Sequence, residues 1–272
     1  MQIKISSFGL LALLWCYANA VPATEGAFSF GIAPQQAVTE LAKRWTPVLE
    51  YISEKSGVKL NFITAKDIAT YQVNMQNGQY DFSFINPYHY TQYQKKAGYR
   101  AFAREKEGLL VGILVARTDG AVKSVFDLQH QTLAFPSANA MAATWLQLQY
   151  LKSEKIDVTP QFVNSMDSVY RAVAKGLFPA GGGELRTFGA VDGDIKAQLK
   201  ILWRADPMPS HPFSYHPRVP KNVVEKVKAA MLKMADDPRG LELLHAINFK
   251  GIEATRDSDY DVVRIMKLQP LK

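Results

Sequence analysis

The stretch Thr132–Leu146, TLAFPSANAMAATWL, decides how the rest of this 272-residue chain is interpreted. Residues Thr132–Phe135 have the character of a short buried strand, Pro136 and Ser137 predict a tight turn, and a helix is expected to begin near Asn139. The first turn of a helix leaves backbone N–H groups without intrahelical partners, and the helix dipole adds partial positive charge there. This combination of strand, small-residue turn and helix start is suited to binding an anion.

Four residues of this turn are candidate ligand contacts. The side chains of Ser137 and Asn139 can either cap the helix or reach a ligand. Ala138 and Ala140 leave room for a ligand to approach the backbone. An ordinary helix cap in an α/β protein is the alternative for this stretch taken alone, so the rest of the chain has to separate the two interpretations.

The first 20 residues have the pattern of a secretory signal peptide. Lys4 supplies the positive charge, Ile5–Trp15 is an apolar run too short to span a bilayer, and Ala18–Ala20 fits an A-x-A cleavage site. We therefore expect residues 1–20 to be removed from an exported, periplasmic protein. Cys16 is the only cysteine; the bulky Trp15 before it disfavours a lipoprotein site, and the mature chain has no disulfide.

Composition and charge narrow the class of protein. The chain is 47% hydrophobic and 21% charged, which is typical of a globular protein with one large domain or two moderate ones. Its net charge is +7, but the basic residues are scattered along the chain. A scattered excess of cations argues against nucleic-acid binding and is compatible with a small anionic ligand.

Up to residue 117, strands and helices alternate along the chain. Strands are expected at Phe28–Ile32, Lys59–Thr64, Asp81–Ile85, Arg100–Lys106 and Leu109–Arg117. Helices are expected over Leu41–Ile52, Ile68–Asn77 and Asn86–Gly98. This alternation predicts a parallel sheet covered by helices.

Asp119–Gly120 breaks the pattern, and a second α/β series follows. Its strands are expected at Thr132–Phe135, Val158–Asn164, Pro179–Gly183 and Lys200–Arg204, and its helices at Val125–Leu128, 139–153, Met166–Lys175 and Ile195–Leu199. Asp206–Pro220 holds five prolines and is expected to be a loop. Helices are then expected over Lys221–Ala235 and Leu241–Ile247.

The sequence thus predicts a two-lobed α/β protein with the second lobe inserted into the first. Lobe 1 comprises residues 27–116 and 206–272, and lobe 2 comprises residues 117–205. Two chain crossings, near Ala116–Gly120 and Trp203–Pro207, would form a hinge with a cleft between the lobes. Ligands of such sheets bind beyond the carboxyl ends of the strands, where the small and polar turns lie.

Two turns of the first lobe are expected at this cleft. The amides of Gln35 and Gln36 follow the first strand and can donate hydrogen bonds. In the turn after DFSFI, Asn86 caps a helix that starts at a proline, and Tyr88 and Tyr90 offer hydroxyl donors and aromatic walls. Burial of either tyrosine in the core is the alternative.

The turn after the strand at Pro179–Gly183 belongs to the second lobe. Its glycines allow a ligand to approach the backbone closely, and Arg186 offers a planar cation for an oxyanion. A surface ion pair is the alternative role for Arg186. His211 is placed at the second crossing as a further ligand contact; a metal pair formed by His211 and His216 is the weaker alternative, so no metal site is expected.

Five motifs in the order of the chain resemble one protein family. FGIAPQQ, YDFSFINPYHY, DLQHQTLAFPS, DSVYRAVAKG and AGGGELRTF are similar to the PhnD-like substrate-binding proteins of phosphate, phosphite and phosphonate ABC importers. The resemblance covers nearly all of the mature chain and implies the type II periplasmic-binding-protein fold.

The resemblance also implies roles for individual residues. Ser137–Ala140 would receive phosphoryl oxygens at the helix start, Tyr90 and Tyr88 would add donors from the other lobe, and Gln35–Gln36 with Glu184–Thr187 would complete the pocket. Two positions depart from the family pattern: Met166 stands where members often carry His, and Ser-Ala-Asn at residues 137–139 replaces Ser-Thr-Ser. The identity of the anion is therefore open.

We interpret the chain as a periplasmic solute-binding protein that captures a small oxyanion, closes, and docks as a monomer on an ABC permease of the inner membrane. No cofactor is expected. The chain contains no G-x-S-x-G, P-loop or H-E-x-x-H motif, and no nucleophile with a partner base stands out, so an enzyme is not expected. The alternatives are a sensory input module of a histidine kinase and a binding protein for a larger organic anion.

Overall fold

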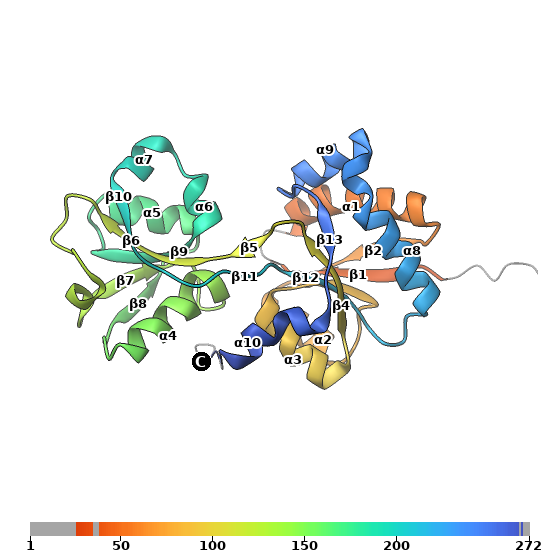
Figure 1. The fold of residues 1–272 in the computed structure, drawn as a ribbon, viewed down its shortest axis with the longest axis horizontal. Coiled ribbons are helices and arrows are strands. Elements are labelled where there is room, and N and C mark those ends of the chain that lie inside the picture. Colours follow the sequence, from red (N-terminus) through yellow and green to blue (C-terminus); the bar gives the residue numbers. More distant parts are fainter. Residues whose placement is uncertain (1–25, 35–37, 267, 269–272) are drawn as a thin grey trace, which may run out of the picture.

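Two lobes lie side by side along the long axis of the molecule (Figure 1). The computed structural model describes residues 26–34, 38–266 and 268. The predicted signal peptide and its cleavage site, and the two glutamines Gln35 and Gln36, lie outside the described residues. Among the helices of the described ranges, none has the length and apolar character needed to cross a membrane.

Lobe 1 is built on a six-stranded sheet with the order β13-β4-β12-β3-β1-β2. Its strands are β1 (Phe28–Ile32), β2 (Leu60–Ile63), β3 (Phe82–Phe84), β4 (Arg100–Glu105), β12 (Pro212–Tyr215) and β13 (Ile252–Ala254). The predicted parallel arrangement is confirmed for β1 with β2 and β3. The sheet as a whole is mixed, because β12 runs antiparallel to β3 and β4, and β13 runs antiparallel to β4.

Helices cover both faces of this sheet. One face packs on α1 (Val38–Ser56), α8 (Lys221–Leu232) and α9 (Pro238–Ala246) through a core that includes Phe30, Trp45 and Phe213. The other face packs on α2 (Ile68–Gln76) and α3 (Pro87–Ala97) through a tyrosine-rich core. The predicted helices are confirmed, and the cap at Asn86, the proline at the first turn and Gly98 at the carboxyl end bound α3 as expected.

Lobe 2 is built on a five-stranded sheet with the order β10-β6-β9-β7-β8. Its strands are β6 (Gly112–Arg117), β7 (Thr132–Phe135), β8 (Thr159–Phe162), β9 (Ala180–Glu184) and β10 (Leu199–Arg204). One face packs on the short helix η1 (Val125–Leu128) and on α4 (Leu146–Ser153). The other packs on α5 (Met166–Ala174), α6 (Leu185–Gly189) and α7 (Gly193–Ala197).

The glycines of β9 serve packing within lobe 2. A Cβ atom on Gly182 would lie 2.3 Å from the Ala143 carbonyl oxygen, and one on Gly183 would lie 2.3 Å from the Tyr170 hydroxyl. The expectation that these glycines admit a ligand is therefore wrong, because neighbouring elements of the same lobe already occupy both faces of the strand.

The hinge contains two antiparallel segments, β5 (Leu109–Leu110) and β11 (Met208–Pro209). Strand β10 ends at Arg204, so the second expected crossing falls at this junction. The first expected crossing, near Ala116–Gly120, does not fall at this junction, because all of β6 pairs with β9 and β10 inside lobe 2. The chain changes lobe at 109–111, and the break at Asp119–Gly120 is a turn beyond the far end of β6.

Three carboxyl-terminal elements differ from the sequence expectation. The proline-rich stretch after β10, predicted as a loop, contains β12, which lies between β3 and β4. Strand β13 and helix α10 (Asp261–Ile265) were not predicted. Figure 1 shows α10 beside α3, and the Gln149 side chain donates to the Met266 carbonyl across the lobes at 2.8 Å.

Candidate functional site

A pocket of about 390 Å³ lies between the lobes; we call it the cleft pocket. Three residues of α6 and the turn after it, in lobe 2, line one side: Arg186, Thr187 and Ala190. Eleven lobe 1 residues line the other side: Ile32, Ala33, Leu41, Arg44, Trp45, Phe84, Glu105, His211, Ile247, Asn248 and Phe249. Because both lobes contribute walls, hinge motion would change the shape of this pocket.

The lobe 1 wall is aromatic. The ring of Phe84, at the carboxyl end of β3, lies 5.1 Å from that of Trp45 on α1 and 6.0 Å from that of Phe249, measured between centroids. His211 stacks on Phe84 with centroids 5.4 Å apart and planes inclined by 28°. Burial, with Arg186 and His89 nearby, lowers the pKa of His211 to about 4, so this ring is neutral at pH 7.

An ion pair joins the two lobes in the cleft pocket. The Nη1 atom of Arg186 donates to both carboxylate oxygens of Glu105, at 3.0 and 2.9 Å. Glu105 ends β4 and its side chain is only 10% exposed, whereas that of Arg186 is 53% exposed. Burial raises the pKa of Glu105, and Arg186 opposes that rise. Arg186 therefore lines the cleft pocket and forms an ion pair between the lobes, while its contact with an oxyanion stays a prediction.

The predicted site residues Glu184 and Thr187 face inward at the start of α6. The buried Glu184 carboxylate accepts from the Arg186 backbone N–H at 3.1 Å and caps the helix, and burial raises its pKa. The Thr187 hydroxyl donates to the Glu184 carbonyl at 2.8 Å and lies 3.0 Å from the sulfur of Met166. These contacts place Met166 beside Thr187, close to the cleft pocket.

The turn Ser137–Ala140 precedes a helix that begins at Met141, two residues later than predicted. The first helical turn, η2 (Met141–Trp145), is a π-helix, an irregularity that is frequent at functional sites. Ala140 is the cap residue and no side chain caps this end, so Ser137 and Asn139 do not act as caps. Both side chains are exposed, and the start of the helix keeps its backbone donors for another partner.

Side chains of the first helical turn hold the turn in place. The Thr144 hydroxyl donates to the Ser137 carbonyl at 2.9 Å, and the indole N–H of Trp145 donates to the Ala138 carbonyl at 2.6 Å. The backbone N–H of Ala140 also donates to the Ser137 carbonyl, at 3.4 Å, so the N–H groups at the start of η2 are the ones that an anion could use.

The half-buried Tyr88 forms an aromatic contact between the lobes. Its ring meets that of Trp145, from lobe 2, edge to face at a centroid distance of 5.1 Å. Its neighbour His89 also contacts Trp145 and is held by Asn86, whose side-chain amide lies 2.9 Å from His89 Nδ1. Burial lowers the pKa of His89 to about 4. Tyr88 therefore lies where the lobes approach each other.

Tyr90 is not a cleft residue, so that prediction is wrong. The side chain is fully buried, its hydroxyl donates to Asp257 at 2.5 Å, and the same oxygen accepts from the Ala101 N–H at 2.9 Å. The reason is helical geometry: α3 begins at Pro87, and two residues along a helix turn the side chain by about 200°. Tyr88 and Tyr90 consequently face opposite sides.

The metal pair considered for His211 and His216 is also not formed. The two residues lie at opposite ends of β12, and His216 packs edge to face on Tyr99, 5.3 Å between centroids, away from Phe84. Within the described ranges, no group of three or more His, Cys, Asp or Glu residues is arranged to hold a metal ion.

Sequence reasoning missed Arg44 and Glu105, two charged residues of the cleft pocket. Arg44 borders the apolar stripe of α1 in the half of that helix nearer β1, and Glu105 is the last residue of β4. Their positions near the ends of elements that meet the cleft were visible in the sequence. The partner of Glu105 was not visible in the sequence, because Arg186 belongs to the other lobe.

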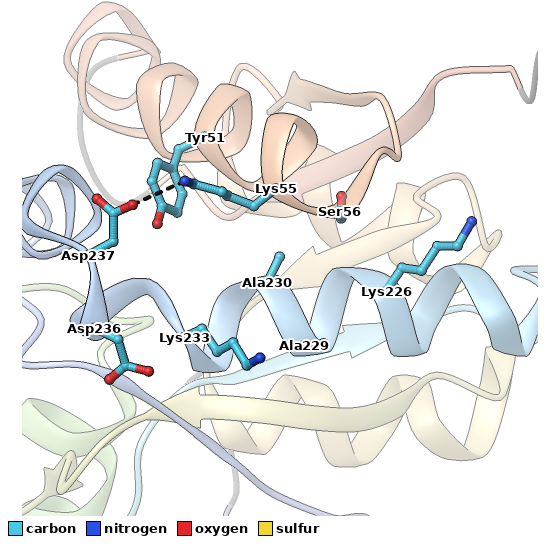
Figure 2. Close-up of a pocket in the computed structure, with 9 residues that line it drawn as sticks. All are labelled: Tyr51, Lys55, Ser56, Lys226, Ala229, Ala230, Lys233, Asp236 and Asp237. Atoms are coloured by element: carbon cyan, nitrogen blue, oxygen red, sulfur yellow. Dashed lines mark ion pairs between the residues drawn. The ribbon is translucent and has the colours of Figure 1, made fainter.

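A second pocket, of about 490 Å³, lies on lobe 1 between α1 and the α8 region (Figure 2). Lys55 and Asp237 form an ion pair across it at 3.1 Å, and Lys226 and Lys233 line it from α8 and its carboxyl end. Every lining residue belongs to lobe 1, so hinge motion would not reshape it. The cleft pocket is therefore the better candidate site.

Comparison with known proteins gives matches to one family over most of the chain. Residues 30–260 match the profile of the periplasmic substrate-binding proteins of phosphonate ABC transporters. Solved structures agree in fold. A binding-protein component of an ABC phosphonate transporter from Pseudomonas aeruginosa is 17% identical with a TM-score of 0.71, covering 89% of this chain and 85% of that one.

Two further structures carry different ligands. The PhnD1 protein of Prochlorococcus marinus, in complex with methylphosphonate, is 14% identical with a TM-score of 0.74, covering 88% of this chain and 96% of that one. A Xanthomonas citri protein bound to ATP is 15% identical with a TM-score of 0.73, covering 88% and 95%. These likenesses confirm the type II periplasmic-binding-protein fold that the sequence motifs implied.

Proposed function

This chain belongs to the family of periplasmic substrate-binding proteins of phosphonate ABC transporters, and we propose that it captures a phosphonate-class oxyanion in the cleft pocket. The family comprises transport proteins that work with a membrane permease, not enzymes. We extend this to the present chain: it binds its ligand without covalent chemistry and delivers it as a monomer. Its predicted signal peptide would be cleaved after Ala20 on export to the periplasm.

One observation carries the proposal: the cleft pocket takes walls from both lobes and lies at the carboxyl ends of β1, β3 and β9. A ligand there would contact both lobes at once and would stabilise the closed arrangement, which is how a binding protein signals occupancy to its permease. The ligands of the similar structures, methylphosphonate and ATP, share phosphorus oxyanion chemistry but not size.

Donors for the oxyanion are available on both sides of the cleft. The helix start at Ser137–Ala140, whose end no side chain caps, is not part of the lining of the cleft pocket, and we propose that it receives phosphoryl oxygens when the lobes close. Tyr88, which is also not part of that lining, would supply a phenolic donor from lobe 1 on closure. Arg186, Thr187 and His211 line the pocket and border the rest of the ligand. Gln35 and Gln36 remain expected contacts at the end of β1.

Thermal unfolding in the presence of oxyanions tests the proposal. The protein is first unfolded, dialysed and refolded, because tight ligands co-purify. At about a thousand times its dissociation constant, a ligand that binds only the native state adds roughly 4 kcal/mol. For a protein of this size each kcal/mol shifts the melting temperature by about 2–4 °C, so we expect a rise on the order of 10 °C with phosphate, phosphite or a phosphonate.

Sulfate at equal ionic strength is the control, because it matches phosphate in shape but carries no proton at neutral pH. A carboxylate or an amino acid should also have little effect. If every phosphorus oxyanion leaves the transition unmoved while some other organic anion shifts it, the ligand class is wrong.

A further inference from the structure

Two arginines line the cleft pocket, and they differ in whether nearby carboxylates compensate their positive charge. The Nη1 atom of Arg186 donates to both carboxylate oxygens of Glu105, at 3.0 and 2.9 Å, and its Nε atom lies 4.0 Å from the Glu184 carboxylate. Two carboxylates therefore compensate one guanidinium. An oxyanion that approached Arg186 would have to share it with both of them, which reduces the gain from that contact.

Arg44 is the uncompensated cation of the pocket. It lies on α1, one residue before Trp45, and is half-buried. Within the part of the chain that the structure describes, no ion pair or hydrogen bond engages its guanidinium group. A half-buried guanidinium offers several donors in a fixed plane, and leaving them without protein partners is costly unless water or a ligand accepts them.

The surface next to Arg44 is apolar. The rings of Trp45, Phe84 and Phe249 border the pocket, and the His211 ring, neutral at pH 7, stacks on Phe84. Only small parts of these rings reach the pocket, because Trp45, Phe84 and Phe249 are 6%, 8% and 7% exposed, but what they present there is apolar. Burying an apolar group against it would gain the usual hydrophobic free energy, and ring-on-ring contact adds to it.

The volume of the pocket exceeds what a bare oxyanion needs. At about 30 Å³ for each water, 390 Å³ holds on the order of ten waters. A tetrahedral oxyanion with four or five heavy atoms fills only a fraction of that space. The size falls in the range of pockets that hold organic ligands, which are apolar with a few well-placed polar groups.

Resting on the proposed oxyanion function, we propose that Arg44 is an anion-binding residue and that the aromatic wall selects an oxyanion carrying a ring-sized apolar group. The ligand class is then an organophosphonate or phosphate monoester with such a group, in preference to phosphate, phosphite or methylphosphonate. Arg44 adds its charge to the head group that the helix start at Ser137–Ala140 receives, and the organic group packs against the exposed edges of Trp45, Phe84 and Phe249.

Calorimetric titration of the refolded, ligand-free mature protein tests this with four probes: phenylphosphonate, phenyl phosphate, methylphosphonate and inorganic phosphate. We expect the two phenyl compounds to bind at least tenfold more tightly than methylphosphonate or phosphate. Comparing the affinities for phenylphosphonate and phenyl phosphate then shows whether the site prefers an organophosphonate or a phosphate monoester.

Variants test whether Arg44 contacts the anion directly or acts only through the net charge of the protein. Arg44→Gln should weaken phenylphosphonate binding at least tenfold, and Arg44→Lys should retain more affinity than Arg44→Gln. The matched control is Lys43→Gln, which removes the same charge from the exposed preceding residue of α1 and should change affinity less than twofold. Far-ultraviolet circular dichroism checks that the variants fold.

Each outcome bears on a different claim. Equal or tighter binding of methylphosphonate or phosphate by the wild type would overturn the aromatic selection. Wild-type affinity in Arg44→Gln, or an equal loss in Lys43→Gln, would overturn the role of Arg44. If none of the four probes binds the wild type, the proposed oxyanion function itself fails.

Discussion

At the scale of single residues, the ion pair between Arg186 and Glu105 shows how far a side chain's role depends on its partner. Arg186 has the exposure of a surface residue, yet it neutralises a carboxylate that is only 10% exposed in the other lobe. Removing one member of such a pair leaves the other without compensation, which costs more than the pair itself contributes.

We predict that Arg186→Ala lowers the free energy of unfolding by about 1–3 kcal/mol at pH 7 and by less at pH 4. Burial already raises the pKa of Glu105, and loss of Arg186 raises it further. A carboxyl group whose folded-state pKa is raised destabilises the fold as the pH rises above its unfolded value of about 4.5. Urea unfolding at the two pH values measures the difference.

The control is Arg104→Ala, one residue before Glu105. It breaks the 2.7 Å pair with Glu253, whose side chain is 33% exposed, within the lobe 1 sheet. We expect a loss below about 1 kcal/mol that is similar at both pH values. Equal losses at pH 4 and pH 7 in Arg186→Ala would show that Glu105 is not the group left uncompensated.

His89 should make stability depend on pH. Burial lowers its pKa from 6.5 to about 4, so its contribution is fully present above pH 6.5 and is lost as the pH falls toward 4. The lowering of the His89 pKa from 6.5 to about 4 corresponds to about 3 kcal/mol in the free energy of unfolding. We expect His89→Gln to flatten the pH profile of urea unfolding between pH 6.5 and 4.

The same substitution at the exposed His245 is the control for this profile, which it should leave as in the wild type. If His89→Gln and the wild type lose stability in parallel over this range, the histidine is not protonated on acid unfolding in the way we infer.

At the scale of elements, β12 shows where local propensity is overridden. Its sequence PFSY lies among five prolines, yet it takes an inner position between β3 and β4. Pro212 is tolerated because it is the first residue of the strand, where the missing N–H disturbs the ladder least. Phe213 then enters the core against Phe84 at a centroid distance of 4.7 Å.

At the scale of elements, we predict that strand β9 does not tolerate a side chain at Gly182. Gly182→Ala should lower the free energy of unfolding by about 1–3 kcal/mol or more, because its Cβ atom would lie 2.3 Å from the Ala143 carbonyl oxygen and 2.5 Å from the Phe135 ring. The matched control is Gly189→Ala in α6, where no atom lies within 4 Å of the added carbon.

For Gly189→Ala we expect no loss, or a gain of up to about 1 kcal/mol through the unfolded state. Urea unfolding measures both variants. Equal stabilities of Gly182→Ala and the wild type would mean that the packing of β9 against η2 is looser than the described distances indicate.

At the scale of the whole molecule, two antiparallel segments and a hydrophobic cluster form the junction of the lobes. The cluster includes Leu110 and Met208 of the hinge strands, Trp145 of lobe 2 and Val263 of α10. Such a narrow connection permits rotation of one lobe against the other while the two sheets remain rigid.

We predict that the protein closes on its ligand. Small-angle X-ray scattering of the refolded protein should give a smaller radius of gyration at saturating ligand than without it, because contacts from both lobes favour the closed state. Sodium chloride at equal ionic strength is the control. Superimposable curves, with binding verified by calorimetry on the same sample, would rule out closure of the cleft.

The sequence by itself determined the elements and the family. The bounds of β1 and β7 match the sequence expectation, and α3 begins and ends where Pro87 and Gly98 predict. These features depend on residues close together in the chain. The motif order was also sufficient to indicate the fold that the comparisons confirm.

Only the tertiary structure decided which distant strands and side chains pair with one another. It placed β6 in lobe 2, inserted β12 between β3 and β4, buried Tyr90 and paired Arg186 with a carboxylate 81 residues away. Local propensity and periodicity carry no information about which distant segment will satisfy a strand edge or a charge. Those choices follow from burial and pairing in the folded chain, where a group left without a partner is costly.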